Sequence, residues 1–207
     1  MEPRSANPSG LAQPPAQRTG PVRWVQLPHA PGVPAQPLAE AWLAEQLDVD
    51  PESLVLVRDV HGRPRFVPPG THDVSWSHSG EGLLVALGDG IELGADLERL
   101  RPRPRALELA RRFFDPAETA WLEQLPDAAL REDSFVRIWC AKEAILKAHG
   151  RGIAFGLHRL RIGEHDGTLQ LLSADPELGA ASDWTLREFM PLPGYRATLA
   201  WRPAAAR

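Results

Sequence analysis

The only two lysines of this chain stand in one short segment, on either side of a glutamate. The segment "WCAKEAILK" covers residues 139–147 and contains Lys142, Glu143 and Lys147, whereas every other basic residue among the 23 is arginine. On a helix, Glu143 and Lys147 are one turn apart and share a face. A solvated Glu–Lys surface pair explains that spacing equally well, but arginine would form such a pair too. Arginine cannot supply a compact ammonium that donates to one oxygen. The use of lysine therefore indicates a specific role for Lys147, with Lys142 as a second candidate.

Two more carboxylates lie in the segment "IELGADLE", residues 91–98. Its alternation predicts a strand with Asp96 and Glu98 on one side, next to Gly94, which permits close approach of another element. Strand carboxylates of this kind are often simply solvated. If Glu143 joins them, three carboxylates form a site for an oxygen-preferring divalent cation such as Mg²⁺, with Mn²⁺ as an alternative.

Two further segments carry groups that suit a phosphate. "SWSHSG" places Ser77 and His78 where an extended segment enters a turn, so that hydroxyls, backbone N–H groups and an imidazole are available. "HGRPRF" offers Arg63 next to another turn. Taken singly, a structural turn with a capping serine and a surface arginine explain these segments as well.

The elements that must position these residues alternate between strands and helices. Strands are expected at 22–27, at 54–58 and after the turn at His61-Gly62, and two more should form a tight hairpin, 83–87 with 91–98, around Gly88-Asp89-Gly90. Extended segments at 157–173, 184–190 and 195–202 follow, with a turn at Asp166-Gly167.

Helices are expected on both sides of that hairpin. "PLAEAWLAEQLDVD" should bury Leu38, Trp42, Leu43 and Leu47. "FDPAETAWLEQL" begins with Asp115 as N-cap and Glu118 placed to close a capping box. The helix that carries Glu143 ends at Gly150. The chain is therefore expected to be α+β or α/β, with a disordered Pro-rich tail at 1–20, an N-terminal lobe at 21–100 and a C-terminal lobe at 101–207.

Composition excludes several classes of protein. The formal charge of −4 over 207 residues gives no general attraction to nucleic acid or to an anionic membrane. The single Cys140 excludes a disulfide framework and a Cys-based zinc site. The chain has no apolar run of spanning length and no secretory signal, so a cytoplasmic protein that binds neither membrane nor nucleic acid is expected.

Taken in order, "GRP", "SHSG", "GADLE", "RFFDPAE" and "WCAKEAILKAHGRGI" resemble the 4′-phosphopantetheinyl transferase superfamily, in particular its longer, Sfp-type branch. The resemblance runs from about residue 54 to 155 and includes the two spaced motifs of the family, G-x-D-x-E and W-x-x-K-E-x-x-x-K. It implies two similar lobes related by a pseudo-twofold, each a small sheet packed on helices, with the active site in the cleft between them. A monomer is expected by the same analogy.

The resemblance also implies a reaction and roles for individual residues. Such enzymes use Mg²⁺ and coenzyme A as co-substrate, transfer 4′-phosphopantetheine to a serine of an acyl, peptidyl or polyketide carrier protein, and release 3′,5′-ADP. Metal ligands would be Asp96, Glu98 and Glu143, and catalytic residues Glu143 and Lys147. Residues that bind coenzyme A would be Arg63, Ser77, His78, Lys142 and Lys147, with His78 at the 3′-phosphate and Lys142 nearer the rim of the cleft.

This chain departs from the family pattern at one place that affects binding. The first predicted helix has no basic residue, so phosphate contacts expected there must come from Arg58, Arg63, Arg65 or elsewhere. The segment at 99–112 is rich in arginine and is either a docking surface for an acidic carrier protein or a solvated linker. Two alternative functions stay open: a Mg²⁺-dependent pyrophosphohydrolase of coenzyme A or a nucleotide, and a catalytically silent module that binds coenzyme A.

Overall fold

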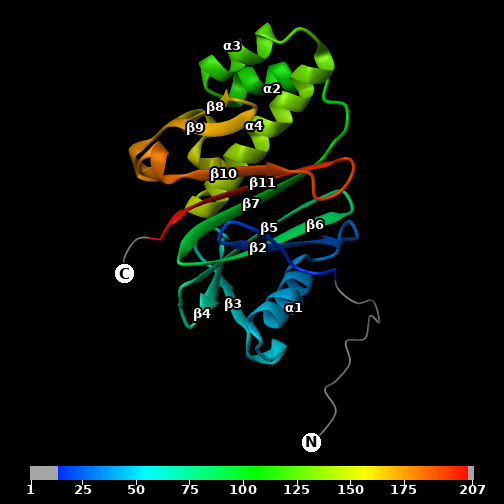
Figure 1. Ribbon diagram of the computed structural model, residues 1–207, viewed down its shortest axis with the longest axis vertical. Helices are drawn as coiled ribbons and strands as arrows, with labels where there is room; N and C mark the ends of the chain where they lie inside the picture. Colours follow the sequence, from blue (N-terminus) through cyan, green and yellow to red (C-terminus); the bar gives the residue numbers. More distant parts are fainter. Residues whose placement is uncertain (1–13, 205–207) are drawn as a thin grey trace, which may run out of the picture.

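The computed structural model describes residues 14–204 and has the expected mixed α+β class (Figure 1). Its helices are α1 Gln36–Leu47, α2 Ala106–Phe113, α3 Pro116–Gln124 and α4 Ala128–His149. Its strands are β1 Gln17–Thr19, β2 Val22–Pro28, β3 Val55–Arg58, β4 Pro64–Val67, β5 His72–Ser79, β6 Gly82–Asp89, β7 Ile91–Arg99, β8 Leu160–His165, β9 Thr168–Ala174, β10 Thr185–Phe189 and β11 Tyr195–Pro203. Short 3-10 helices occur at Pro51–Ser53, Gly152–Phe155, Leu157–Arg159, Pro176–Leu178 and Ala181–Asp183.

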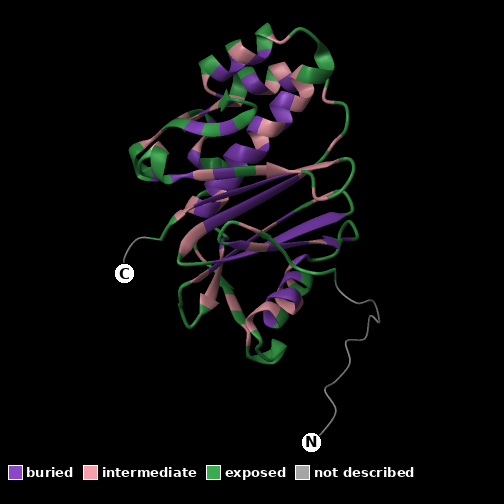
Figure 2. Ribbon diagram, in the orientation of Figure 1, coloured by how far each residue is buried: buried purple, intermediate pink, exposed green. Residues whose placement is uncertain are grey.

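Two antiparallel sheets form the centre of the molecule. One has the strand order β1-β2-β6-β5 and the other the order β10-β11-β7, while β3–β4 and β8–β9 form separate two-stranded ribbons. Helix α1 covers the outer face of the first sheet, and α4 lies along the second, with α2, α3 and the β8–β9 ribbon beyond it (Figure 1). The central strands of both sheets and the inner sides of the helices are buried (Figure 2).

The space between the two sheets is filled by large apolar side chains. One buried cluster joins the two sheets. It contains Trp24 of β2, Leu84 of β6, Leu93 and Leu97 of β7, and Trp201 of β11. Burial of one face of β7 leaves its opposite face, which carries Gly94, Asp96 and Glu98, turned toward α4. The expected alternation along β7 is confirmed.

The expected hairpin of β6 with β7 is wrong. Strand β6 pairs with β2 and β5, whereas β7 pairs with β11, so the two strands belong to different sheets. Gly90 has φ of 67° and makes the turn from one sheet to the other. A Gly-Asp-Gly turn allows the chain to reverse but does not determine which strand becomes the hydrogen-bonded neighbour.

Two smaller expectations are also corrected. Residues 17–19, which are expected to lie in the tail, form β1 and pair with β2, while residues 1–13 lie outside the described part. Leu38 is 37% exposed, because α1 packs on the sheet through Ala39, Trp42 and Leu43 instead. The lobe boundaries and the pseudo-twofold stay predictions.

The helices near the site begin and end as their sequences predict. Asp115 caps α3 and Glu118 closes the capping box, whereas α4 ends at Gly150, whose φ of 96° suits glycine. No helix among residues 14–204 is long and apolar enough to span a membrane.

Candidate active site

The acidic face of β7 lies directly under helix α4 because Gly94 has no side chain. A Cβ at Gly94 would lie 1.8 Å from the carbonyl oxygen of Ala144 and 2.6 Å from the amide nitrogen of Ala148. The backbones of the strand and the helix are therefore in contact at this residue. That contact brings Asp96 and Glu98 next to the side of α4 that carries Glu143 and Lys147.

Lys147 joins α4 to both β7 and β5. Its Nζ lies 2.7 Å from Asp96 Oδ1 and donates to Ser77 Oγ at 2.8 Å, and the Ser77 hydroxyl donates to the same Asp96 oxygen at 2.9 Å. Lys147, Asp96 and Ser77, which come from three separate segments of the chain, thus form one hydrogen-bonded group. The structure brings together these residues of the expected site.

Glu143 carries an unusual carboxyl group. Burial, with the negative charges of Asp96 and Glu98, raises its pKa to about 7, although the ammonium of Lys147 opposes the shift. Burial and Asp96 also raise the pKa of Glu98, against the effect of Arg103. The negative charges of Asp96, Glu98 and Glu143 therefore influence one another, and their sharing of one cation stays a prediction.

Glu98 has a partner that the sequence did not reveal. Arg103 donates to its Oε2 at 2.5 Å, and Ser79 Oγ lies 3.5 Å from the same oxygen.

Three serines of β5, Ser75, Ser77 and Ser79, all face β7. The hydroxyl of Ser75 accepts a hydrogen bond from the amide of Ala95, and the hydroxyl of Ser79 accepts one from the amide of Arg99. The sequence signal for these serine contacts is the alternation S-W-S-H-S, which puts three hydroxyls on one side of β5.

His78 faces the opposite side of β5 from Ser77. Its ring stacks on His29, with the centroids 4.7 Å apart, and burial, His29 and Lys147 lower its pKa. His29 is 5% exposed, its Nε2 lies 2.8 Å from the carbonyl oxygen of Val33, and its Nδ1 has no partner among the described residues. Because β5 is an edge strand, a ligand that contacts both Ser77 and His78 must pass over that edge.

Arg63 has a structural role beside its expected contact to the nucleotide, and that contact stays a prediction, since Arg63 also lines the cavity next to Lys147. Its guanidinium is buried and bonds to the carboxylate of Asp73, to the carbonyl oxygen of Lys147 at 2.7 Å and to that of Leu93 at 3.0 Å. Arg63 therefore fastens the β3–β4 ribbon to α4 and β7. Arg58, at the end of β3, is exposed, and its guanidinium lies 5.3 Å from the ring centroid of Trp76.

The expected place of Lys142 at the rim of the cleft is wrong. Its side chain is 0% exposed, and its Nζ lies 2.8 Å from Glu118 Oε2 and donates to the carbonyl oxygens of Leu157, at 2.7 Å, and Leu160. Adjacent residues of a helix point in directions about 100° apart. Glu143 faces β7, and Lys142 consequently points into the interior on the side of α3 and β8.

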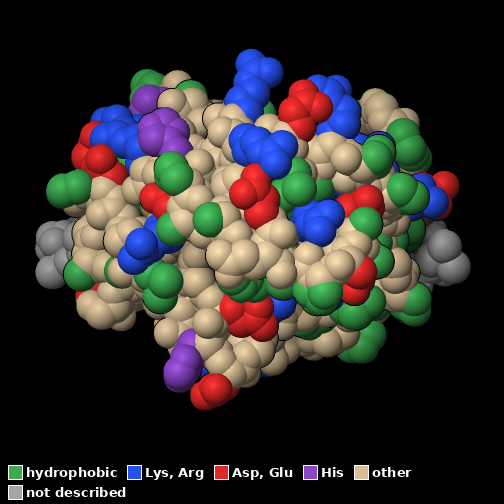
Figure 3. Space-filling view, turned by 90° about the horizontal axis from the view of Figure 1, so that it is seen from above, with side chains coloured by type: hydrophobic (Ala, Val, Ile, Leu, Met, Phe, Trp, Pro, Cys, Tyr) green, Lys and Arg blue, Asp and Glu red, His purple; other side chains and the backbone are tan. Residues whose placement is uncertain are grey.

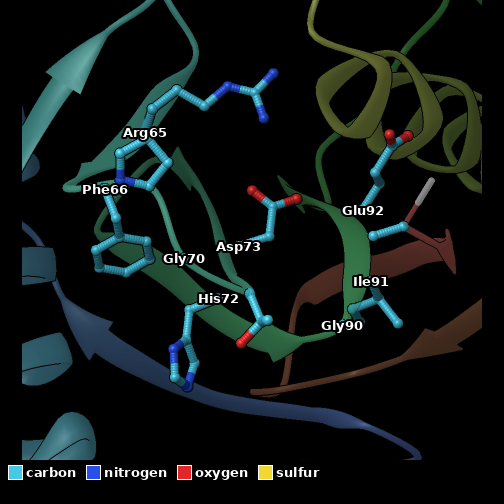
Figure 4. A pocket seen from close by; sticks show the side chains of 11 residues that line it. Arg65, Phe66, Gly70, His72, Asp73, Gly90, Ile91 and Glu92 are labelled. Atoms are coloured by element: carbon cyan, nitrogen blue, oxygen red, sulfur yellow. The ribbon is translucent and has the colours of Figure 1, made fainter. Parts of the chain in front are cut away.

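Two cavities differ in their relation to these residues. A cavity of about 160 Å³ is lined by Arg58, Arg63, Trp76, Lys147 and Gly150, beside the Lys147–Asp96–Ser77 group. A larger cavity of about 620 Å³ lies at the other end of β5 and β7, with Arg65, Phe66, His72, Asp73 and Glu92 in its wall (Figure 4). The smaller cavity adjoins the predicted chemistry.

The donor set fits an oxygen-preferring cation only in part. Asp96 Oδ2 is buried without a hydrogen-bond partner in the described chain, and all three candidate ligands are carboxylates, which suits Mg²⁺. Within residues 14–204, however, no three acidic, His or Cys side chains converge as a preformed metal site. Lys147 and Arg103 instead provide the positive charge that the carboxylates need.

The arginine-rich segment after β7 is mixed in charge rather than uniformly basic. Arg103 pairs with Glu98, Arg105 with Glu108, and Arg111 with Glu123. In the view onto the α2–α3 end, blue and red side chains alternate (Figure 3). Arg101 and Arg112 are exposed and have no ion pair among the described residues.

Comparison with known proteins shows the family of the chain. Residues 92–200 match the model of the 4′-phosphopantetheinyl transferase superfamily, and the chain belongs to this family. It is 37% identical over 147 residues to slr0495 of Synechocystis, which covers 70% of this chain and 58% of that protein. It is 34% identical over 171 residues to the 4′-phosphopantetheinyl transferase HetI of Nostoc, covering 78% of this chain and 68% of HetI.

A third relative is more distant. The 4′-phosphopantetheinyl transferase Sfp of Bacillus subtilis is 27% identical over 162 residues, which cover 77% of this chain and 68% of Sfp. The matched parts thus span about three fifths to two thirds of the relatives' own lengths.

Proposed function

We propose that this protein transfers the 4′-phosphopantetheine group of coenzyme A to a serine hydroxyl of an acyl, peptidyl or polyketide carrier protein and releases 3′,5′-ADP. The observation that carries the proposal is the convergence of Asp96, Glu143 and Lys147 from a strand and a helix that are far apart in sequence, in a chain of this family. The cavity beside Lys147, with Arg58 and Trp76 in its wall, supports binding of a nucleotide there.

In this reaction the serine oxygen of the carrier protein forms a bond to the phosphorus that bears the pantetheine. The bond from that phosphorus to the bridging oxygen breaks, and 3′,5′-ADP leaves with the electron pair. Asp96, Glu98 and Glu143 would hold Mg²⁺, which would supply positive charge to the diphosphate. Lys147, whose ammonium lies 2.7 Å from Asp96, would stabilise the charge that grows on the leaving group.

The carboxyl of Glu143 is suited to accept the proton that the serine loses. Without metal the pKa of Glu143 is about 7, and a bound Mg²⁺ would lower it, so the carboxylate would be ionised and able to accept the proton. Ser77 and His78, on the two sides of edge strand β5, would contact phosphate groups of coenzyme A. Arg63 would act indirectly, by holding the carbonyl of Lys147.

The direct test incubates the protein with coenzyme A, Mg²⁺ and a panel of apo-carrier proteins, followed by mass spectrometry. Transfer adds one phosphopantetheine to the carrier serine and yields 3′,5′-ADP in equal amount. Glu143→Gln should abolish transfer, whereas Glu45→Gln, at an exposed position of α1, should behave as the wild type. Wild-type activity in Glu143→Gln would remove Glu143 from the mechanism.

The same assay separates the two alternative functions. Breakdown of coenzyme A in the absence of any carrier protein would support a pyrophosphohydrolase, because the same carboxylates serve hydrolysis. Binding of coenzyme A with no product at all would support a catalytically silent module. Either result would refute the transferase proposal.

A further inference from the structure

We propose that the buried ion pair of Lys142 and Glu118 is a positioning device that sets the rotation of α4 and so aims Glu143 and Lys147 at β7. The proposal rests on the proposed function, since it concerns the same active site. It assigns to Lys142 a role in the reaction without contact to substrate, and it gives Glu118 a role beyond the helix cap.

The contacts of this pair join three elements at one point. Glu118 Oε2 accepts from Lys142 Nζ at 2.8 Å and from the amide of Asp115 at 2.9 Å, while its Oε1 accepts from the amide of Ile162 at 2.6 Å. Glu118 is 2% exposed, so none of this is solvated. One carboxylate thus links the start of α3, strand β8 and the middle of α4.

The ammonium of Lys142 is equally well satisfied. Its three donors meet Glu118 and the carbonyl oxygens of Leu157 and Leu160, which lie just before and at the start of β8. Its Nζ also lies 5.1 Å from the ring centroid of Phe114. A guanidinium has five donors in a rigid plane, and in this closed space some of them would lack partners. The pocket therefore explains why an arginine-rich chain has a lysine here.

The apolar contacts of α4 are not directional, so its rotation depends on its polar contacts. Lys147 and Arg137 make such contacts toward β7 and β10, and the Lys142–Glu118 pair adds one toward α3 and β8. The helix packs on the rest of the core through alanines and aliphatic side chains such as Ala141, Ala144, Ile145 and Ala148, and such contacts tolerate small rotations. A side-chain end about 6 Å from the helix axis moves by about 2 Å when the helix turns by about 20°. A misplacement of about 1 Å can cost about 100-fold in rate.

Lys142 and Glu143 are neighbours on the same helix, which makes the coupling short. Whatever rotation the Lys142–Glu118 contact imposes is passed to Glu143 through one peptide unit and to Lys147 within two turns. Buried ion pairs are seldom more stabilising than well-packed apolar residues, so a role in orientation accounts for this pair better than a role in stability does.

The test replaces both charges at once, because removing one partner would leave the other buried and unpaired. The double variant Glu118→Leu with Lys142→Met keeps the volume apolar and should remain folded. We expect its KM for coenzyme A to stay within about threefold of the wild type while kcat falls at least about tenfold. Its crystal structure should show α4 rotated relative to β7.

Matched variants separate positioning from loss of stability. Ile138→Val removes one buried methylene from the same helix, and it should lower the melting temperature without lowering kcat. Glu118→Asp keeps the charge pair but shortens one partner, so it should fold even if the double variant does not, and its kcat should be lowered at unchanged KM. Lys142→Arg, made in the otherwise wild-type chain, should also lower kcat, because the guanidinium does not fit the pocket.

The outcomes distinguish this inference from the proposed function. If the wild-type protein transfers no phosphopantetheine, the proposed function fails. If the wild type is active, and the double variant or Glu118→Asp turns over at the wild-type kcat with α4 unmoved, the positioning role is refuted and the transferase stands. A rise in KM at constant kcat would also refute it, because that pattern belongs to a residue that binds substrate.

Discussion

Replacement of Glu143 by glutamine should make the metal-free protein more stable while it removes activity. The pKa of Glu143 is raised from 4.5 to about 7. Each pKa unit corresponds to about 1.4 kcal/mol, so above pH 7 the ionised group costs the folded state up to about 3 kcal/mol. Glutamine has nearly the same shape and no charge. It must still bury an amide, so we expect a gain of about 1–3 kcal/mol at pH 8.

The sign of the pH dependence follows from the direction of the shift. The folded-state pKa lies above the unfolded value, so below about pH 4.5 the group is protonated in both states and costs nothing. Stability is lost as the pH rises from about 4.5 to about 7, where the unfolded state ionises before the folded state does. The advantage of Glu143→Gln should therefore be large at pH 8 and below about 1 kcal/mol at pH 5.

The assay is urea unfolding in the presence of a chelator at pH 8 and at pH 5. For a chain of this size, a gain of about 1 kcal/mol raises the melting temperature by about 2–4 °C, so thermal unfolding gives a second measure. Glu45→Gln, at an exposed position of α1, should change stability by less than about 0.5 kcal/mol at either pH. A variant Glu143→Gln that is no more stable than the wild type at pH 8, or equally stabilised at both pH values, would refute the reasoning.

Three further changes test the surroundings of that carboxyl. Lys147→Arg should keep less than about a tenth of the transfer rate, because a planar guanidinium cannot replace the ammonium that contacts Asp96 at 2.7 Å. Turnover at the wild-type rate would show that the positive charge alone is sufficient. Gly94→Ala should lower the free energy of unfolding by more than about 3 kcal/mol, since its Cβ would lie 1.8 Å from a main-chain oxygen of α4, and a wild-type melting temperature would contradict the contact. Asp73→Asn breaks a buried ion pair with Arg63 and should cost about 3–5 kcal/mol in urea unfolding; a cost under about 1 kcal/mol would mean that Arg63 finds another partner.

Local patterns predicted the parts of this protein that depend on local physics. Alternation in residues 91–98 placed Asp96 and Glu98 on one side of β7, and the capping box at Asp115 and the glycine at Gly150 predicted the start of α3 and the end of α4. Each of these features is set by hydrogen bonds or side-chain directions within a few residues. The resemblance of the two motifs then led to the family, which the comparisons confirm.

The errors have a common physical origin. The turn at Gly90 predicted a hairpin of β6 with β7. Which strand pairs with β7 depends on distant parts of the chain, however, and its hydrogen-bonded neighbour is β11. The family resemblance places Arg63 and Lys142 near the ligand. Lys142 is buried instead, because Glu118 neutralises it from another segment of the chain, and Arg63 is bonded to Asp73 although it also lines the cavity beside Lys147.

What the sequence by itself determined is the inventory: three carboxylates, two ammonium groups and a glycine, at spacings that put each on a definite side of a strand or a helix. What only the tertiary structure decided is which charges meet. Lys147 faces Asp96 and Ser77, whereas Lys142, five residues earlier on the same helix, faces Glu118 in the interior. Side-chain direction follows from local geometry, but the pKa of Glu143 and the identity of each counter-ion depend on burial and on long-range packing, which local sequence does not specify.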